Sequence, residues 1–324
     1  MKFSLRLNND VGADELVAIA IRAEQLGFQQ LWVSHDLFWR SAPVLLALVA
    51  RETTTLEIGA GVMNPSSSSV AEIAMSAATL HEVSAGRFRL GLGSGAAEFL
   101  GWAGIPAPRP LGSTREAVGA LRALFAGHSP AGLPAEGHLR FPASGVPIYI
   151  GAMGPRMVEL AGEIADGALP LLFPPERFAK VLGHVQAGAA RGGRDLAKFD
   201  LAACIWVSID ADPERARRAL AAKIAYYGAS FAPALLAEAG LAPADFEPLQ
   251  AALATGDEEG AVRLVTAGML ALGIAGDAAA VIERCRHLAD LGARHISFGP
   301  PLGPDRLAAV ETLGREVLPA LAGL

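Results

Sequence analysis

Short β-type runs alternate with longer helical runs along almost the whole chain. The β-type runs are rich in branched and aromatic side chains, and the runs between them repeat apolar residues at helical spacing. Eight strands alternating with helices over 324 residues predict an α/β fold, a closed TIM-type (β/α)8 barrel, with a doubly wound open sheet as the competitor. Strands are expected at 3–7, 30–34, 56–62, 87–93, 147–151, 168–173, 200–209 and 295–299. Helices are expected at 13–28, 43–51, 69–82, 113–126, 155–165, 175–190, 212–227, 277–291 and 304–320.

Two segments interrupt this alternation. Residues 127–146 are rich in proline and glycine and could hold a small hairpin around "HLRF". Residues 228–276 form a helical insertion before the last barrel unit, where Tyr226, Tyr227 and Phe231 could line a substrate site or pack in the insertion's own core. Insertions of this kind usually decorate the functional rim. We expect a single domain over 1–324.

The composition narrows the classes of function. The net charge of −6 argues against a nucleic-acid partner, which would need a basic face, and no apolar run is long enough to span a bilayer. The N-terminus lacks the apolar core of a signal peptide, so a cytoplasmic protein is expected. The two cysteines, the scattered histidines and the lack of a G-x-S-x-G sequence disfavour metal and serine chemistry. These observations favour a cofactor-dependent reaction on a small molecule.

The fifth strand runs into a helix that has no capping side chain. The junction reads Gly151, Ala152, Met153, Gly154 and Pro155, without Ser, Thr, Asp or Asn. A proline near the first helical position leaves no hydrogen bond unmade, because it has no backbone N–H. The other N–H groups of the first turn need an acceptor. A ligand phosphate suits free donors at the positive end of a helix. Water or a neighbouring loop is the alternative acceptor.

The second strand is followed by His35 and Asp36. Adjacent residues of an extended chain point to opposite sides, so at most one of them faces the barrel mouth easily. The alternative is that Asp36 caps a local turn and His35 lies on the surface. Both readings remain open on the sequence alone.

Glycines mark the third and fourth strands. Gly59 and Gly61 predict a bulge or a close backbone approach, and Ser68 or Ser69 can cap the helix that follows. Gly91 and Gly93 fit the dinucleotide pattern only loosely, because the acidic residue that it needs falls inside a predicted helix. We therefore reject a Rossmann site and interpret these glycines as a loop that lets a ligand come close.

Four segments together carry a resemblance to one family. They are "LWVSHDLFWRSAPVLLALVA", "LEIGAGVMNPSSSSVAEIAMSAATLHEVSAGRFRLGLGSG", "IYIGAMGPRMVELAGEIADG" and "DLGARHISFGPPLGPD". With them, the sequence resembles the bacterial luciferase-like flavin superfamily and, within it, most of all the coenzyme F420-dependent methylenetetrahydromethanopterin reductases. The likeness runs almost end to end, including the helical insertion.

The resemblance implies a barrel with an insertion and a bound F420 or, alternatively, FMN, whose ring lies over the mouth at the carboxyl ends of the strands. It implies a non-prolyl cis peptide after the third strand, here at Gly61-Val62. It also implies a phosphate seat at Gly151 to Gly154, with help from Ser94. The expected cofactor-binding residues are Gly61, Val62, Met63, Asn64, Ser94, Gly151, Ala152, Met153, Gly154 and Pro155.

Two departures from the family pattern concern the candidate catalytic residues Asp36, His35 and Arg6. The family's reductases read Asp-His after the second strand, whereas this chain reads His35-Asp36, so either residue could meet the cofactor. Arg6 stands where those reductases carry a glutamate. A guanidinium stays charged and suits an anionic substrate or a carbonyl that develops negative charge. Alternatively, Arg6 pairs with Asp36 or another acid at the rim.

The leading hypothesis is hydride transfer between F420 and a small organic substrate by a luciferase-like oxidoreductase. An FMN-dependent monooxygenase and a nicotinamide-dependent reductase without flavin stay open. A non-catalytic homologue that binds a phosphate-bearing ligand is the alternative of another class. The resemblance also implies a homodimer or a higher homo-oligomer.

Overall fold

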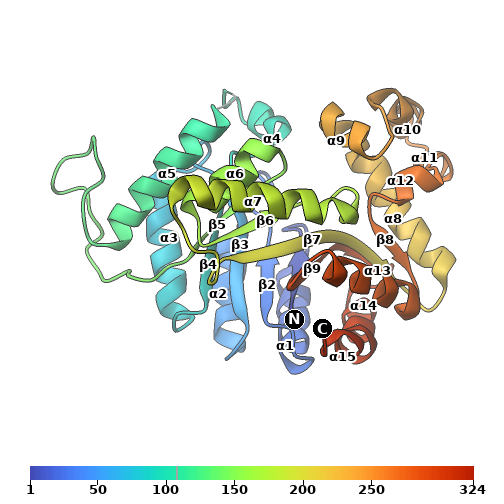
Figure 1. Cartoon of the computed structure of the whole chain (residues 1–324), viewed down its shortest axis with the longest axis horizontal. Coiled ribbons are helices and arrows are strands. Elements are labelled where there is room, and N and C mark those ends of the chain that lie inside the picture. The colour runs from blue at the N-terminus through green and yellow to red at the C-terminus, as the bar shows by residue number, and fades with distance from the viewer. Residues whose placement is uncertain (107–108) are drawn as a thin grey trace. The chain divides into compact units, whose positions relative to one another are not determined.

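The computed structural model describes residues 1–106 and 109–324, apart from the side chain of Ala229 (Figure 1). Its residues form two compact units, each described here by itself. The first unit comprises Met1–Phe3, Leu171–Lys180 and Ala203–Leu324, and the second comprises Ser4–Pro170 and Val181–Ala202. Strands β1 (Lys2–Leu7) and β7 (Asp200–Ile209) each begin in one unit and continue into the other.

The second unit contains a run of parallel strands that lie side by side in chain order. After β6, the next neighbour is the start of β7, through the pairs Gly167–Asp200 and Ala168–Leu201. Each strand lies within one residue of its expected start, although β6 ends three residues early. The strands that follow β1 are β2 (Gln30–Val33), β3 (Glu57–Met63), β4 (Phe88–Leu92), β5 (Ile148–Ala152) and β6 (Gly167–Pro170).

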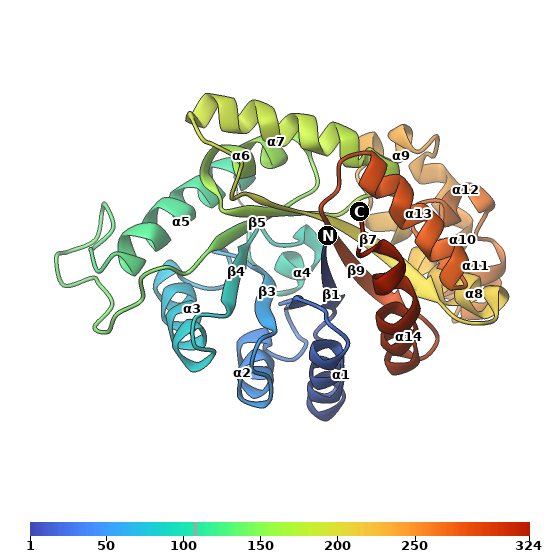
Figure 2. The same cartoon turned by 60° about the horizontal axis from the view of Figure 1, so that its bottom comes forward.

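Helices of the second unit pack against its strands. Figure 2 shows α1, α2 and α3 side by side in a row along β1 to β4. Their apolar faces are buried, as the helical spacing of Leu16, Ile19 and Ala23 in α1 predicts. The helices are α1 (Ala13–Gln25), α2 (Ala42–Glu52), α3 (Val70–Val83), α4 (Ala97–Trp102), α5 (Pro110–Phe125), α6 (Pro155–Ile164) and α7 (Phe178–Gly192).

Local signals set the ends of these helices. The Ser69 side chain accepts a hydrogen bond from the Glu72 N–H at 3.2 Å, which confirms Ser69 as the cap of α3. Gly27 follows α1 with a φ of +87°, a left-handed conformation that glycine adopts at little cost. Strand β3 shifts register against β4 between Ala60 and Met63, which confirms the predicted irregularity around Gly61.

The first unit holds β7 beside β8 (Ile274–Gly276) and β9 (His295–Leu302), with β7 between them. The insertion supplies short helices that gather beside α8 (Pro213–Tyr227) and share one apolar cluster (Figure 1). Phe231 is buried in that cluster, Tyr227 packs against it, and Tyr226 is exposed. The insertion contains η2 (Gly228–Ser230), α9 (Pro233–Glu238), η3 (Pro243–Phe246), α10 (Glu247–Ala254), α11 (Glu258–Arg263) and α12 (Ala267–Leu270). The chain ends in α13 (Ala278–Asp290), α14 (Arg306–Thr312), the π-helical turn Leu313–Val317 and α15 (Leu318–Leu321).

One local expectation was wrong, and two short elements were not predicted. Residues 127–146, all of which the structure describes, form turns and bends instead of a hairpin. Pro130, Pro134 and Pro142 remove backbone donors there, and Gly132 and Gly145 adopt positive φ. Helix α4 and strand β8 were not predicted, because each is too short to show a period. In the part of the chain that the structure describes, no helix is both long and apolar enough to cross a membrane.

Candidate functional site

His35 lies in the loop between β2 and α2, and the start of α2 fixes its ring. Its Nδ1 accepts a hydrogen bond from the Ala42 N–H at 3.2 Å. Burial lowers the pKa of the imidazole and outweighs the attraction of the Asp36 carboxylate. The N-terminus of α2 also disfavours a positive charge there. His35 is therefore neutral at pH 7, and its hydrogen sits on Nε2, which makes that atom a hydrogen-bond donor.

Asp36 belongs to a hydrogen-bonded junction built on Asn9. The Ser34 hydroxyl lies 2.8 Å from Asp36 Oδ2 and 2.9 Å from Asn9 Oδ1. The Asn9 amide donates to the carbonyl oxygens of Asp36 at 2.9 Å and Arg40 at 2.8 Å. Asn9 is 1% exposed. It ties the loop after β1 to the loop after β2. Sequence reasoning missed it, although an asparagine two residues beyond a strand was a signal.

Arg6 lies on β1, where it is paired in register with Trp32 of β2. Its side chain is half-buried. The three candidate catalytic residues thus come from neighbouring strands, with Arg6 inside β1 and with His35 and Asp36 just beyond the end of β2.

The peptide bond between Gly61 and Val62 is cis, as the resemblance implies. The Val62 side chain lies in a space that glycines leave open. A Cβ on Gly93 would lie 2.7 Å from Val62 Cγ2, and one on Gly151 would lie 2.8 Å from Val62 Cγ1. The interpretation of Gly93 as an open approach for a ligand is therefore wrong, because a side chain of the protein fills that space.

Trp32 supports β3 from the side of β2. A Cβ on Gly59 would lie 2.2 Å from Trp32 Cε3, and one on Gly61 would lie 3.4 Å from the same atom. The indole N–H donates to Gln30 Oε1 at 3.0 Å, and its ring meets Tyr149 edge-on with centroids 5.1 Å apart. The residues around Gly61 are therefore backed by a rigid aromatic surface that sequence reasoning did not find.

A polar network continues from this aromatic pair. The Tyr149 hydroxyl donates to Asp200 Oδ2 at 2.9 Å, and Gln30 Nε2 donates to Glu57 Oε2 at 2.6 Å. Burial, together with the charge of Asp200, raises the pKa of Tyr149 far above its usual range. Glu57 also forms an ion pair with Arg89. These side chains link residues at the starts of five strands to one another.

Met63 is the last residue of β3, and Asn64 and Ser94 lie in the loops beyond β3 and β4. The Met63 carbonyl accepts a hydrogen bond from the Gly93 N–H at 2.9 Å. The Asn64 side-chain oxygen accepts from the N–H groups of Ser66 at 3.2 Å and Ser67 at 2.9 Å, so it shapes its own loop. Ser94 is half-buried beside Gly95.

The N-terminus of α6 is bare in the structure, as predicted. Gly154 occupies the cap position without a side-chain hydrogen bond, and its carbonyl accepts from Met157 and Val158 at 3.1 Å each. Among the described residues, no acceptor meets the N–H of Gly154 or of Arg156. A Cβ on Gly154 would meet nothing within 4 Å. Two open donors, free space and the positive end of a helix dipole fit an anion such as phosphate.

The residues of the predicted phosphate seat do not all play the same role. Ala152 is buried at the end of β5, and Gly151 makes room for Val62. Only Met153, Gly154 and Pro155 are exposed at this junction.

As for metals, the described residues contain no group of three or more His, Cys, Asp or Glu side chains that could hold an ion.

Comparisons with known proteins agree with this architecture. The sequence profile of a family described as Luciferase-like monooxygenase matches residues 1–295. The chain is 33% identical to a 5,10-methylenetetrahydromethanopterin reductase of Archaeoglobus fulgidus, over 99% of this chain and 100% of the relative. It is 30% identical to an F420-dependent glucose-6-phosphate dehydrogenase of Nakamurella multipartita, over 97% of this chain and 94% of the relative.

The structure is also similar to a solved one. It matches the coenzyme F420-dependent tetrahydromethanopterin reductase of Methanopyrus kandleri with a TM-score of 0.89, at 27% identity and over 98% of both chains. This likeness confirms the predicted fold, a closed parallel (β/α)8 barrel with inserted helices and an extra strand, and excludes the open sheet.

Proposed function

Because the chain belongs to the luciferase-like monooxygenase family, we propose that it is an oxidoreductase that uses coenzyme F420 to reduce or oxidise a small organic substrate. Relatives that match it over nearly their whole length are named as F420-dependent enzymes or as methylenetetrahydromethanopterin reductases. When bound, F420 supplies a carbon centre that gives or accepts a hydride. The protein's task is to bind, orient and polarise the reactants.

The observation that carries this proposal is the open end of α6. The N–H groups of Gly154 and Arg156 would hold the cofactor's phosphate, assisted by the helix dipole. The ring would then lie toward Gly61 and Val62, whose position Trp32 supports. Met63, Asn64 and Ser94 would shape the loops beside it.

We assign the chemistry at the substrate to His35 and Arg6, with Asp36 as the positioning residue beside them. Neutral His35 would donate a hydrogen bond from Nε2 to a substrate oxygen, because Nδ1 already accepts from Ala42. Asp36 would hold the loop through Ser34. Arg6 would stabilise negative charge that develops on the substrate. This set of groups suits a carbonyl or alcohol substrate better than the cationic iminium of a pterin.

The test substitutes the helix cap. Gly154→Asp would place a carboxylate where the phosphate is proposed, and the backbone at residue 154 (φ −86°, ψ 154°) suits an aspartate cap. We expect unchanged or slightly higher thermal stability, together with at least about a tenfold loss of F420 affinity, or roughly 1.4 kcal/mol. Gly154→Ala is the matched control, because its methyl group meets nothing within 4 Å and carries no charge.

Titration of the purified protein distinguishes the alternatives. F420, FMN and a reduced nicotinamide are added separately, and binding is followed by tryptophan fluorescence. Preferential binding of FMN would favour a monooxygenase, and binding of the nicotinamide alone would favour a flavin-free reductase. If none of the three binds, the chain is a non-catalytic homologue and the proposal fails.

We further propose that the chain is a single barrel domain, with its insertions near 127–146 and 228–276, that works in the cytoplasm as a homodimer. Exposed apolar side chains on adjacent helices support the dimer. Val44 and Leu48 lie one turn apart on α2, and Met75 lies on α3. Sedimentation of the wild type against Leu48→Glu tests it, since a charge at an apolar interface would shift a dimer toward monomer.

A further inference from the structure

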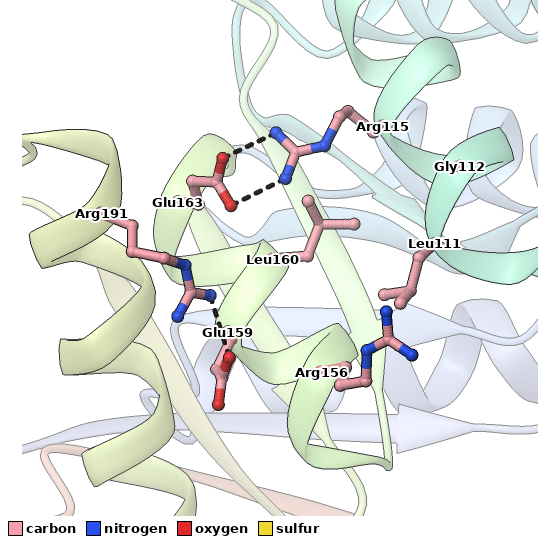
Figure 3. Close-up of a pocket in the computed structure, with 8 residues that line it drawn as sticks. All are labelled: Leu111, Gly112, Arg115, Arg156, Glu159, Leu160, Glu163 and Arg191. Carbon is pink, nitrogen blue, oxygen red and sulfur yellow. Dashed lines mark hydrogen bonds and ion pairs between the residues drawn. The ribbon is translucent and has the colours of Figure 1, made fainter.

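A pocket of about 320 Å³ lies between α5, α6 and α7 in the second unit (Figure 3). It combines two apolar side chains with five charged ones. Its lining residues are Leu111, Gly112, Arg115, Arg156, Glu159, Leu160, Glu163 and Arg191.

Both acidic side chains of this pocket are already neutralised. Glu163 receives two parallel hydrogen bonds from Arg115, each 2.7 Å long. Glu159 pairs with Arg191 at 2.9 Å and with His184 at 3.1 Å. The hydrogen bond from Arg115 lowers the pKa of Glu163, and the one from His184 lowers the pKa of Glu159. The two carboxylates are therefore ionised and engaged.

Of the three arginines that line the pocket, Arg156 is the one that takes part in neither ion pair. Within the ranges 1–106 and 109–324, its guanidinium has no ion pair or hydrogen bond. In Figure 3 it extends toward Leu111, away from the two ion pairs. The sequence places alanine and proline at 107 and 108, which carry no carboxylate. The pocket thus has one positive charge in excess and apolar walls from Leu111 and Leu160.

This pocket begins where the proposed phosphate seat ends. Arg156 follows the cap residue Gly154 by two positions, on the first turn of α6. Coenzyme F420 continues beyond its phosphate into a chain of glutamates, each with a free carboxylate. We propose that this pocket binds the glutamate tail of the cofactor, with Arg156 pairing to a tail carboxylate and the two leucines contacting its methylene groups. The inference rests on the proposed function.

The experiment measures dissociation constants for three forms of the cofactor. They are the full glutamylated form, a form that ends at the phosphate side without glutamates, and the ring with its ribityl chain alone. For the wild type, we expect the glutamates to tighten binding about three- to tenfold, as one charge-assisted pair at a solvent-exposed pocket would. Arg156→Gln keeps the backbone N–H of residue 156 and should abolish that difference, so that the forms with and without glutamates bind with equal affinity.

Two further variants complete the design. Arg51→Gln removes an exposed arginine from the last turn of α2 and should bind every form as the wild type does. Arg156→Lys keeps the charge without the planar fork and should retain part of the difference. Added salt should weaken the tail's contribution in the wild type and leave Arg156→Gln unaffected.

The outcomes separate the two proposals. If the wild type binds the forms with and without glutamates equally, the tail has no site here, although the proposed function stands. If Arg156→Gln weakens both forms alike, Arg156 serves the phosphate and the tail proposal is overturned. If no form binds to the wild type, the proposed function itself is wrong and the tail site falls with it.

Discussion

The side chain of Val62 occupies the space in which a Cβ of Gly151 would stand. The two residues come from β3 and β5, and only 2.8 Å would separate Val62 Cγ1 from that Cβ. Real side chains almost never approach so closely, so the glycine is a packing requirement of the strand that precedes α6.

Gly151→Ala should therefore be destabilising. We expect a loss of about 1–3 kcal/mol in the free energy of unfolding, because the added methyl group overpacks a close contact. Adding Val62→Ala should restore part of the loss, since the two sites share one contact and should show a coupling of about 0.5–3 kcal/mol. Urea denaturation of the two single variants and the double variant measures this. Strictly additive losses would contradict the packing argument.

Sequence reasoning located most elements of the fold because their signals are local. The alternation of runs such as 30–34 with amphipathic stretches such as 13–28 identified all eight strands of the barrel and missed only the extra strand β8. The bare cap at Gly154 was equally readable, because capping depends on the few residues around a helix start. The resemblance located the cis bond at Gly61-Val62, which no local propensity indicates.

The features that the sequence did not reveal depend on contacts between residues that lie far apart in the chain. Glycine at 93 signals that something comes close, but only the fold shows that it is Val62 rather than a ligand. The buried Asn9 joins two loops that are separated by 27 positions, counted to Asp36. The excess charge of Arg156 becomes visible only once Arg115 and Arg191 have found their own acidic partners on α6.

The hydrogen bond between Tyr149 and Asp200 should contribute to stability. Tyr149 is 4% exposed, and its hydroxyl donates to the Asp200 carboxylate at 2.9 Å. Tyr149→Phe removes the donor and should cost about 1.5–3 kcal/mol, the range for a hydrogen bond to a charged group. Tyr226→Phe is the matched control, because Tyr226 is exposed and should change the unfolding free energy by less than about 0.5 kcal/mol. Equal changes in the free energy of unfolding for the two variants would show that this buried hydrogen bond does not contribute to stability.

His35 should make the protein less stable in mild acid. Burial lowers the pKa of His35 in the folded state. Below the unfolded-state pKa of about 6.5, the unfolded chain therefore binds a proton at His35 that the folded protein does not bind. Stability should be constant above that value and fall as the pH drops toward the folded pKa. His35→Asn keeps an acceptor for the Ala42 N–H and should flatten this part of the profile.

The measurement compares urea midpoints at pH 8 and pH 5.5 for the wild type, His35→Asn and His128→Gln. His128 lies at the surface and controls for the loss of an imidazole as such. A wild type and a His35→Asn variant with parallel pH profiles would show that burial does not perturb His35 in the folded protein.

The last prediction concerns the attachment of α9 within the first unit. Arg177 is 8% exposed and donates to Glu238 at 3.0 Å, whereas the neighbouring Lys180 reaches the same carboxylate at 3.1 Å from an exposed position. Glu238→Gln leaves a buried guanidinium without its counter-charge, so we expect a loss of about 1–3 kcal/mol, less than for a fully buried pair because Glu238 is partly exposed. Lys180→Met removes only a surface ion pair and should cost at most about 1 kcal/mol. Thermal unfolding and limited proteolysis of residues 228–276 report the effect. The Glu238 variant should be cleaved faster there than the Lys180 variant, and equal cleavage would show that Arg177 does not anchor the insertion.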